Sequence, residues 1–321
     1  MHTVTLSDIQ EARARLQGIT TRTRLIEFHP ADPARRLFLK PENQQPIGAF
    51  KLRGAYNKIA SLSEVDRKCG VISYSSGNHA QGVAYAARAL GVKAVIVMPN
   101  NAPAIKREAT AALGAEIVLV GPGSAERQLK AEELAAQHGY VIVPPYNDEK
   151  IIAGQGTIGL EILEDLPEVE AVFAPVGGGG LISGVAAAIK MTKPEVQVIG
   201  VEPELAADAQ SSLRAGKIVQ FPADQVSRTI ADGLRTQSVG NINFEHMQCF
   251  VDAIVTVSED EIQQALKLLS ENPATVAEPS GAVATAGFLF RADQLPKTLL
   301  NVAIISGGNI EPKMLEDVRS H

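Results

Sequence analysis

The sequence has few cysteines, and it lacks long apolar runs and clusters of basic residues. Cys69 and Cys249 lie far apart and form no CxxC motif, which excludes a disulfide framework and a cysteine zinc site. They favour buried, reduced thiols in a cytosolic protein. The longest apolar stretches have only the length of a strand, so no membrane is expected as a partner. The N-terminus lacks a signal-peptide core and predicts an amphipathic helix capped by Ser7.

Charge is scattered along the chain and slightly acidic. The 30 Lys and Arg residues stand against 36 Asp and Glu residues, a formal net charge of −6. Without a basic run the chain lacks the positive surface that neutralises a phosphate backbone, so nucleic acid is not expected as a partner. The 321 residues suffice for about two domains, each with its own hydrophobic core.

Short β-branched segments alternate with helical patterns from Gly70 onward. Helical patterns cover residues 78–90, 104–113 and 125–138. The strands around them are GVISYSS, AVIVMP, EIVLV and YVIVPP. Apolar runs without strict alternation are typical of parallel strands that are covered on both faces. This part of the chain therefore predicts a βαβαβαβ unit with helices on both sides of its sheet.

A second alternating series follows, with strands AVFAPV, VQVIGVE and NVAIIS. Helices are expected over GTIGLEILEDL, over residues 181–190, and over SEDEIQQALKLL, where Ser258 and Glu261 form a capping box. We place the smaller unit at residues 61–147 and the larger one at 148–321. No repeat or Pro-rich linker separates them, so the two doubly wound α/β units are expected to share a cleft.

Four consecutive glycines follow the strand AVFAPV and precede a helix. A loop without Cβ atoms can wrap closely around an anion, and the helix N-terminus adds free N–H groups, so a phosphate is the expected ligand. A tight turn would need only one or two glycines. The dinucleotide-binding spacing is matched only trivially, which disfavours a nicotinamide cofactor. We call these residues the tetraglycine loop: Gly177, Gly178, Gly179 and Gly180.

Two further strand ends carry polar residues. SSGNHAQG, from Ser75, places Ser76, Asn78 and His79 at the start of a helix, where they are either site groups or ordinary caps and structural hydrogen-bonding groups. SGGN, from Ser306, closes the strand NVAIIS. Both segments are expected at the carboxyl edge of a sheet, where doubly wound folds bind ligands.

Lys51 lies in an apolar setting, within GAFKLRGA. Desolvation there could lower the pKa of its amine, so that the free base attacks a carbonyl. A lone lysine is more often a surface residue, so this segment predicts a catalytic lysine only in combination with the other segments.

Four segments occur in a fixed order along the chain: GAFKLRGA, SSGNHAQG, GGGGLISG and SGGN. In this order they resemble the fold-type II pyridoxal-phosphate (PLP) enzymes, closest to the serine and threonine dehydratases and serine racemases. IAGQGTIGLEIL, TIADGL and AEPSGAVA agree as well, so the resemblance covers almost the whole chain. It implies the tryptophan synthase β-like fold and a PLP site in the cleft between two domains. Residues 1–60 would join 148–321 in a large PLP-binding domain, with 61–147 as the small substrate domain, in a homodimer.

The resemblance also assigns roles to single residues. Lys51 would form the internal aldimine with PLP and remove the α-proton of the substrate, and Ser76 would move a proton on the opposite face. Asn78 would bond the 3′ oxygen, Ser306 would face the pyridine nitrogen, Phe50 would stack on the ring, and the tetraglycine loop would hold the phosphate. The amino-acid substrate would lie near Ser75, Ser76, Gly77, Asn78, His79 and Arg127.

A serine beside the pyridine nitrogen cannot keep it protonated, which makes the ring a weaker electron sink and suits rapid loss of a β-substituent. Serine or threonine would then give pyruvate or 2-oxobutyrate and ammonia. Protonation from the Ser76 side would give racemisation instead. Serine racemase and 3-hydroxyaspartate dehydratase are therefore the alternatives, and a non-catalytic phosphometabolite-binding module is the alternative of a different class.

Some positions depart from the family pattern. Ile47 and Ala49 replace a threonine and a serine, which removes two hydroxyls expected near the substrate. Together with Arg235 in IADGLRT, this change could favour an acidic or bulkier β-substituent. Arg24 stands where relatives have a proline. The chain stops 12 residues after Asn309, so we expect no regulatory domain and no isoleucine feedback.

An acidic loop follows the strand VQVIGVE. Glu202, Ala206 and Asp208 match the spacing at which racemase-like relatives bind a divalent ion, through two carboxylates and a backbone carbonyl. Oxygen ligands suit Mg²⁺, Mn²⁺ or Ca²⁺, which would keep the substrate domain ordered. Without the resemblance, a solvated acidic loop is the simpler interpretation.

Overall fold

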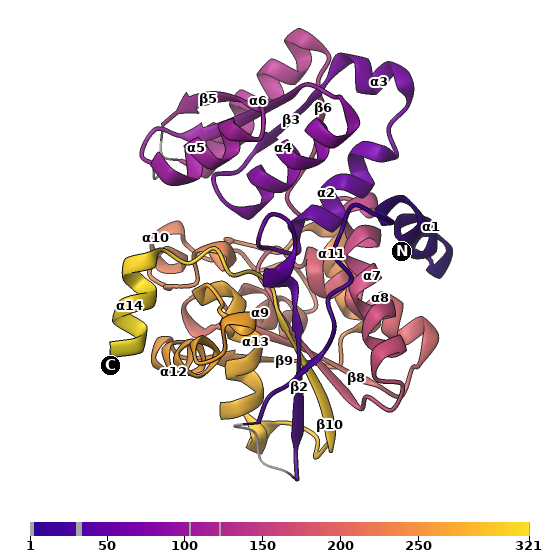
Figure 1. Ribbon diagram of the computed structural model, residues 1–321, viewed down its shortest axis with the longest axis vertical. Coiled ribbons are helices and arrows are strands. Elements are labelled where there is room, and N and C mark those ends of the chain that lie inside the picture. The colour runs from indigo at the N-terminus through magenta and orange to yellow at the C-terminus, as the bar shows by residue number, and fades with distance from the viewer. Residues whose placement is uncertain (1–2, 30–33, 103, 122, 321) are drawn as a thin grey trace.

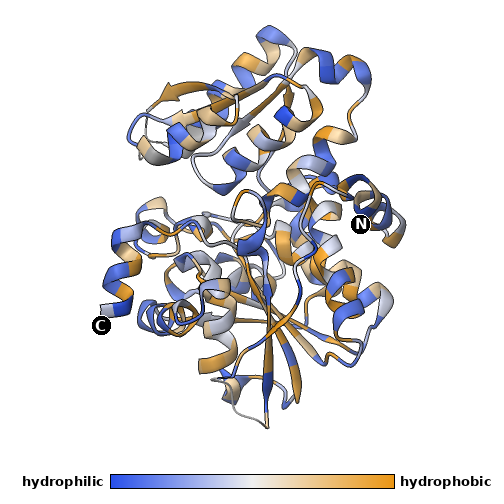
Figure 2. Cartoon of the chain, viewed as in Figure 1, coloured by the Kyte–Doolittle hydropathy of each residue, from blue (hydrophilic) through white to orange (hydrophobic). Residues whose placement is uncertain are grey.

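The computed structural model describes residues 3–29, 34–102, 104–121 and 123–320, and its two sheets lie one above the other along the long axis (Figure 1). Apolar residues concentrate on the strands of both sheets, and polar residues on the outer faces of the helices (Figure 2). No helix within these ranges is both long and apolar enough to cross a membrane.

The upper sheet has four parallel strands in the order β5-β4-β3-β6, which confirms the predicted βαβαβαβ unit. Strand β6 is shorter than the segment YVIVPP because its two prolines have no N–H to donate to a neighbouring strand. The elements are β3 (Val71–Tyr74), α4 (Asn78–Leu90), β4 (Ala94–Pro99), α5 (Ala104–Ala112), β5 (Glu116–Val120), α6 (Ser124–His138) and β6 (Val141–Ile142).

The lower sheet has six strands in the order β1-β2-β10-β7-β8-β9, and only the β1–β2 pair is antiparallel. Its two faces bury alternate residues of the same strands. Val172 packs with α7, α8 and α11, whereas Phe173 packs with α12 and α13, so the predicted double winding is confirmed. The strands are β1 (Ile26–Glu27), β2 (Arg36–Pro41), β7 (Ala171–Pro175), β8 (Gln197–Pro203), β9 (Ala253–Val257) and β10 (Leu300–Ile305).

Helices cover both faces of the lower sheet and connect it to the upper one. On one face lie α7 (Glu149–Asp165), α8 (Gly180–Thr192) and α11 (Asn241–Phe250); on the other lie α12 (Glu259–Ser270), with the predicted capping box, and α13 (Pro279–Phe290). The remaining helices are α1 (Leu6–Leu16), α2 (Lys51–Ala60), α3 (Glu64–Cys69), α9 (Asp208–Ala215), α10 (Ala223–Val226) and α14 (Pro312–Ser320).

Helix α2, which begins at Lys51, packs against α4 of the upper unit and α7 of the lower unit. Gly54 and Gly154 face each other where α2 crosses α7; a Cβ on Gly154 would lie 2.7 Å from the Cα of Gly54. Two small residues therefore allow the helix that carries the lysine to lie directly on the longest helix of the lower unit. The division at residues 60 and 147 stays a prediction.

Two local expectations were wrong. The first helix is capped by Thr5 and not by Ser7, because the Thr5 hydroxyl and the Asp8 carboxylate form a reciprocal capping box. The thiols of Cys69 and Cys249 are exposed and not buried. Cys69 ends the short helix α3, which has no buried residue among those described, and Cys249 follows the buried Met247 on the outer side of α11.

Candidate active site

A cavity of about 660 Å³ lies between the two units, at the carboxyl ends of β3, β7 and β10. Its position is the one predicted for a ligand of a doubly wound fold. Phe50, Lys51 and Tyr146 line it together with residues 74–79 and 177–181. The cavity also includes residues 232–238, Arg127 and Ser306, so it gathers all the predicted catalytic, cofactor and substrate residues.

Lys51 is the first residue of α2, and its Nζ atom donates a hydrogen bond to the Pro145 carbonyl at 2.9 Å. Burial lowers the pKa of this amine to about 8. The loop before the lysine is joined to the SGGN segment, because the Phe50 amide donates to the Ser306 carbonyl at 3.0 Å and Ala49 pairs with Gly307. The lysine and the predicted partner of the pyridine nitrogen are thus held on adjacent backbones.

The tetraglycine loop joins β7 to α8. Gly179 has a φ of +91°, which disfavours any residue with a Cβ, and a Cβ on Gly178 would lie 2.3 Å from the ring of Tyr146. The 13-residue helix α8 begins at Gly180, at the wall of the cavity. The free N–H groups and the positive end of the helix dipole therefore face the position predicted for a phosphate.

Helix α4 also begins at the cavity wall, with Asn78 as its first residue. The Ser75 hydroxyl accepts a bond from the Gly77 amide at 3.3 Å, which shapes the turn that carries Ser76. His79 Nε2 lies 3.0 Å from the Val143 carbonyl, which can only accept, so this nitrogen carries the hydrogen. Burial, and then the Lys51 charge, lower the pKa of His79 to about 3, so its imidazole is neutral.

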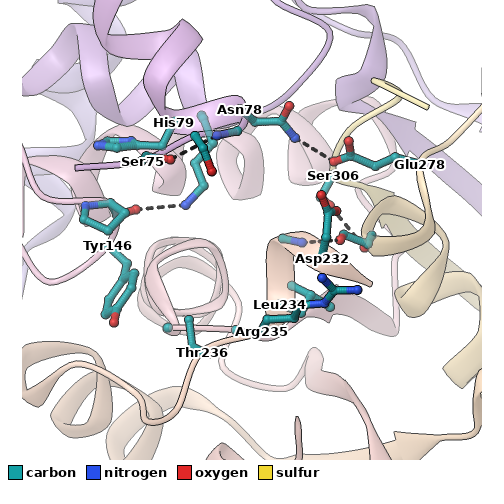
Figure 3. A pocket seen from close by; sticks show the side chains of 18 of the residues that line it. Ser75, Asn78, His79, Tyr146, Asp232, Leu234, Arg235, Thr236, Glu278 and Ser306 are labelled. Atoms are coloured by element: carbon teal, nitrogen blue, oxygen red, sulfur yellow. Dashed lines mark hydrogen bonds between the residues drawn. The ribbon is translucent and has the colours of Figure 1, made fainter. Parts of the chain in front are cut away.

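The sequence predicted no role for Glu278, although its segment AEPSGAVA is one of those that agree with the family pattern. This carboxylate lines the cavity, is only 7% exposed, and accepts a hydrogen bond from Asn78 Nδ2 at 2.6 Å (Figure 3). Burial, and then the negative charge of Asp232, raise its pKa to about 7. Asp232 itself pairs with Lys106 of α5 at 2.8 Å, an ion pair between the two units.

Tyr146 is a second lining residue that the sequence did not single out. Its ring packs on Gly178 and its backbone carbonyl accepts a bond from Asn243 of α11 at 3.3 Å. In the view of Figure 3 it lies across the cavity from Glu278. Its place after β6, at the carboxyl end of a parallel strand, is the signal that could have indicated it.

Two of the positions that depart from the family pattern lie in the hydrophobic core. Ile47 and Ala49 are 6% and 0% exposed, pack in the core around α2 and α4, and do not belong to the residues described as lining the cavity. The two family hydroxyls expected near the substrate are thus replaced by side chains that pack into the core, and the pairing of Ala49 with Gly307 holds this loop there. Arg24 forms an ion pair with Asp165 at 2.7 Å.

Arg235 lines the cavity, and its guanidinium is bound to the protein backbone. Its Nη2 and Nε atoms donate to the Thr229 carbonyl at 2.6 and 2.9 Å. Arg127 lines the cavity from α6, and burial lowers its pKa.

The two carboxylates predicted to bind a metal are buried, although Glu204 between them is exposed, which contradicts a fully solvated loop. Glu202 and Asp208 are both 0% exposed. The Glu202 carboxylate accepts bonds from the amides of Ala209 and Gln210 at 2.9 and 2.8 Å, whereas, among the described residues, only the backbone amides of Asp208 itself and of Val239 stabilise the charge on the Asp208 carboxylate. Burial raises the pKa of Asp208 to about 7. No group of three or more His, Cys, Asp or Glu side chains that could hold a metal occurs in the described ranges.

Comparisons with known proteins agree with this geometry. A family model described as pyridoxal-phosphate dependent enzyme matches residues 16–307. An L-threonine ammonia-lyase of Thermotoga maritima is 46% identical over 98% of this chain and 78% of that protein. The L-threo-3-hydroxyaspartate ammonia-lyase of Saccharomyces cerevisiae is 40% identical over 96% and 94% of the two chains. The structure of maize serine racemase is similar with a TM-score of 0.93 and 36% identity, covering 98% and 97%. The chain belongs to the family of pyridoxal-phosphate-dependent enzymes.

Proposed function

We propose that the protein uses PLP to convert L-threonine and L-serine into a 2-oxo acid and ammonia by α,β-elimination of water. The observation that carries this proposal is the amine of Lys51, with its pKa lowered to about 8, in the same cavity as the tetraglycine loop. A binding module for phosphorylated metabolites would need the loop but not the lysine. The name of the Thermotoga relative supports the same reaction.

The residues of the cavity fit the cofactor. A Cβ on Gly177, Gly178 or Gly180 would meet Leu234 or Tyr146 at 3.2, 2.3 and 2.9 Å, so these positions exclude side chains and the loop lines the cavity with backbone alone, as a phosphate site requires. Lys51 would hold the aldehyde carbon and Ser306 the pyridine nitrogen. When bound, PLP would supply an electron-withdrawing ring that weakens the Cα–H bond of the substrate.

Lys51 would transfer the protons, and the start of α4 would bind the substrate. With the substrate held by the cofactor, Lys51 would take the α-proton as a base, and its lowered pKa suits this task near neutral pH. The resulting ammonium would return this proton to the β-hydroxyl, which would leave as water, and hydrolysis of the released enamine would give the 2-oxo acid and ammonia. The N–H groups at the start of α4 would bind the substrate carboxylate.

A substrate panel tests the proposal. Purified protein loaded with PLP should release 2-oxo acid from L-threonine or L-serine, measured with a coupled dehydrogenase, and Lys51→Ala should abolish both the release and the visible absorbance of the bound cofactor. Lys58→Ala is the matched control, because Lys58 lies on the same helix and pairs with Asp148. Inertness toward serine, threonine and 3-hydroxyaspartate together would overturn the dehydratase proposal.

Two related reactions have a specific observation each. Ser76 lines the cavity, and a proton delivered from its side would racemise serine, the activity in the name of the maize neighbour. Arg235 lines the cavity, and its cationic group favours a substrate with an acidic β-substituent, as in the name of the yeast relative. Chiral analysis of the remaining amino acid, together with 2-oxo acid release from each substrate, separates these reactions.

We also propose that Glu202, Asp208 and the Ala206 carbonyl hold a divalent cation, Mg²⁺, Mn²⁺ or Ca²⁺. The burial of the Glu202 and Asp208 carboxylates supports it, because backbone amides are the only hydrogen-bond donors to either of them among the described residues, and buried carboxylates are costly unless a cation compensates them. The expected homodimer and cytosolic location stay predictions. Sedimentation equilibrium of the holoenzyme and localisation of a tagged chain would test them.

A further inference from the structure

Glu278 is a buried carboxylate that lines the cavity and has no role in the reaction proposed above. It directly precedes α13 with the backbone angles of a helix cap, but its side chain makes no capping hydrogen bond. The carboxylate instead points at Asn78, 200 residues earlier in the chain, at the start of α4 (Figure 3). The carboxylate therefore joins α13 to distant segments, through Asn78 and the backbone of Asn309, and does not cap its own helix.

A chain of hydrogen bonds fixes the orientation of the Asn78 amide. Asn309 Nδ2 donates to the Ile47 carbonyl at 2.9 Å and to Asn78 Oδ1 at 2.7 Å. Because a carbonyl only accepts, Asn309 is oriented by Ile47, and Asn78 must present its oxygen to Asn309. Its nitrogen then donates one hydrogen to Glu278 Oε1 at 2.6 Å. The second hydrogen on Asn78 Nδ2 remains for another acceptor.

We infer that Glu278 is a positioning residue, which holds the Asn78 amide so that its second N–H donates to the ring oxygen of the bound cofactor. This inference rests on the proposed function, in which Asn78 bonds that oxygen. It deepens the proposal, because the hydrogen bond would depend on a residue of the lower unit although Asn78 belongs to the upper one. Gly307 fits this arrangement, since a Cβ there would lie 2.5 Å from Glu278 Oε1.

A double-mutant cycle on cofactor binding tests the inference. Glu278→Ala should weaken PLP binding, followed by fluorescence of the titrated apoprotein, about tenfold to hundredfold, the usual loss for a charge-assisted hydrogen bond. It should also shift the visible absorbance maximum of the bound cofactor, which a merely structural tie would not move. Asn78→Ala should give the same shift, and the double variant should lose little more affinity than Asn78→Ala alone.

Two further variants keep the test decisive. Glu278→Gln retains an oxygen that accepts from Asn78 but lacks the charge, so it should restore part of the affinity and move the absorbance maximum back toward the wild-type position. Glu278→Asp keeps the charge but withdraws it by one methylene, and it should show the shift even if the alanine variant folds poorly. Glu311→Gln is the matched control, because Glu311 lines the same cavity and makes no hydrogen bond to the described side chain of Asn78.

The inference would be overturned if the absorbance maximum were unshifted in both Glu278→Ala and Glu278→Asp. It would also be overturned if Glu278→Ala lowered the affinity for PLP equally in the wild-type protein and in the Asn78→Ala variant. Those results leave the proposed function intact, provided that wild-type protein shows the visible absorbance of the bound cofactor and Lys51→Ala does not. Failure of wild-type protein to bind PLP would overturn both.

Discussion

The Nζ atom of Lys51 lies 2.9 Å from the carbonyl oxygen of Pro145. Pro145 belongs to the segment that leads from β6 in the upper sheet to α7 in the lower unit, and the carbonyl of Val143 in the same segment accepts the bond from His79. The lysine is thus held by a neutral acceptor, and burial is the cause of its lowered pKa. Burial removes water from the ammonium form of the lysine and no ion pair replaces that water, so the neutral amine is favoured.

The first prediction concerns the pH dependence of cofactor incorporation. With a pKa of about 8, roughly a tenth of Lys51 is the free amine at pH 7 and most of it at pH 9. The rate at which the apoprotein reacts with PLP should therefore rise about tenfold between these pH values and then level off. Stopped-flow absorbance measures it, with Nα-acetyl-lysine as the control for the titration of PLP itself. A rate that keeps rising to pH 10 would contradict the lowered pKa.

The second prediction separates the ligand-binding role of Gly179 from its backbone strain. Gly179→Ala places a Cβ at a φ of +91°, which should cost about 1–2 kcal/mol of folding free energy and weaken PLP binding more than tenfold. Gly216→Ala is the matched control, because Gly216 has a φ of +66° with open space around it and does not line the cavity. Both variants should unfold at lower urea concentration, but only Gly179→Ala should lose PLP affinity. Equal affinities would argue against the loop as the phosphate site.

The parallel strands and their polar ends could be predicted from the sequence because the signals are local. Helix α4 begins and ends at the predicted residues, 78 and 90. The tetraglycine loop and the SGGN segment meet at one cavity because β7 and β10 are adjacent parallel strands whose carboxyl ends share an edge. The tetraglycine loop could be predicted for the same reason, because its signal lies in four consecutive residues. Local composition and the order of elements were sufficient for these features.

Contacts between distant segments could not be predicted in the same way. The bond between Asn78 and Glu278 spans 200 residues, and the pairing of β2 with β10 joins the two ends of the chain. The family resemblance led us to expect that Ile47 and Ala49 replace two hydroxyls near the substrate, but the pairing of Ala49 with Gly307 places this loop in the core. A motif match does not determine which side chain faces a cavity.

The third prediction concerns the two buried carboxylates. Adding Ca²⁺, Mg²⁺ or Mn²⁺ at millimolar concentration should raise the Tm of the wild-type protein by several degrees, since an ion that binds only the folded state stabilises it. Asp208→Asn should abolish the increase. Asp293→Asn, at an exposed position, should leave it unchanged. An equal increase in all three proteins would indicate nonspecific salt effects and contradict the site.

The fourth prediction concerns Arg53, two residues after the lysine. Its guanidinium is 1% exposed and donates to both carboxylates of Glu42 and Glu161, at 2.7–2.9 Å, while Lys40 donates to Glu161 at 2.6 Å. Two buried cations and two buried anions thus compensate each other and fasten α2 to the end of β2 and to α7.

Arg53→Met would leave two buried carboxylates with one cation, so we expect a loss of about 3–5 kcal/mol in the free energy of unfolding, measured by urea titration of the apoprotein. Arg53→Lys should recover only part of it, because an ammonium cannot bond both carboxylates in the planar geometry of a guanidinium. Lys68→Met, which removes an exposed ion pair with Glu64 on α3, should cost less than about 1 kcal/mol. If Arg53→Met were as mild as Lys68→Met, the buried network would not be what holds the lysine helix in place.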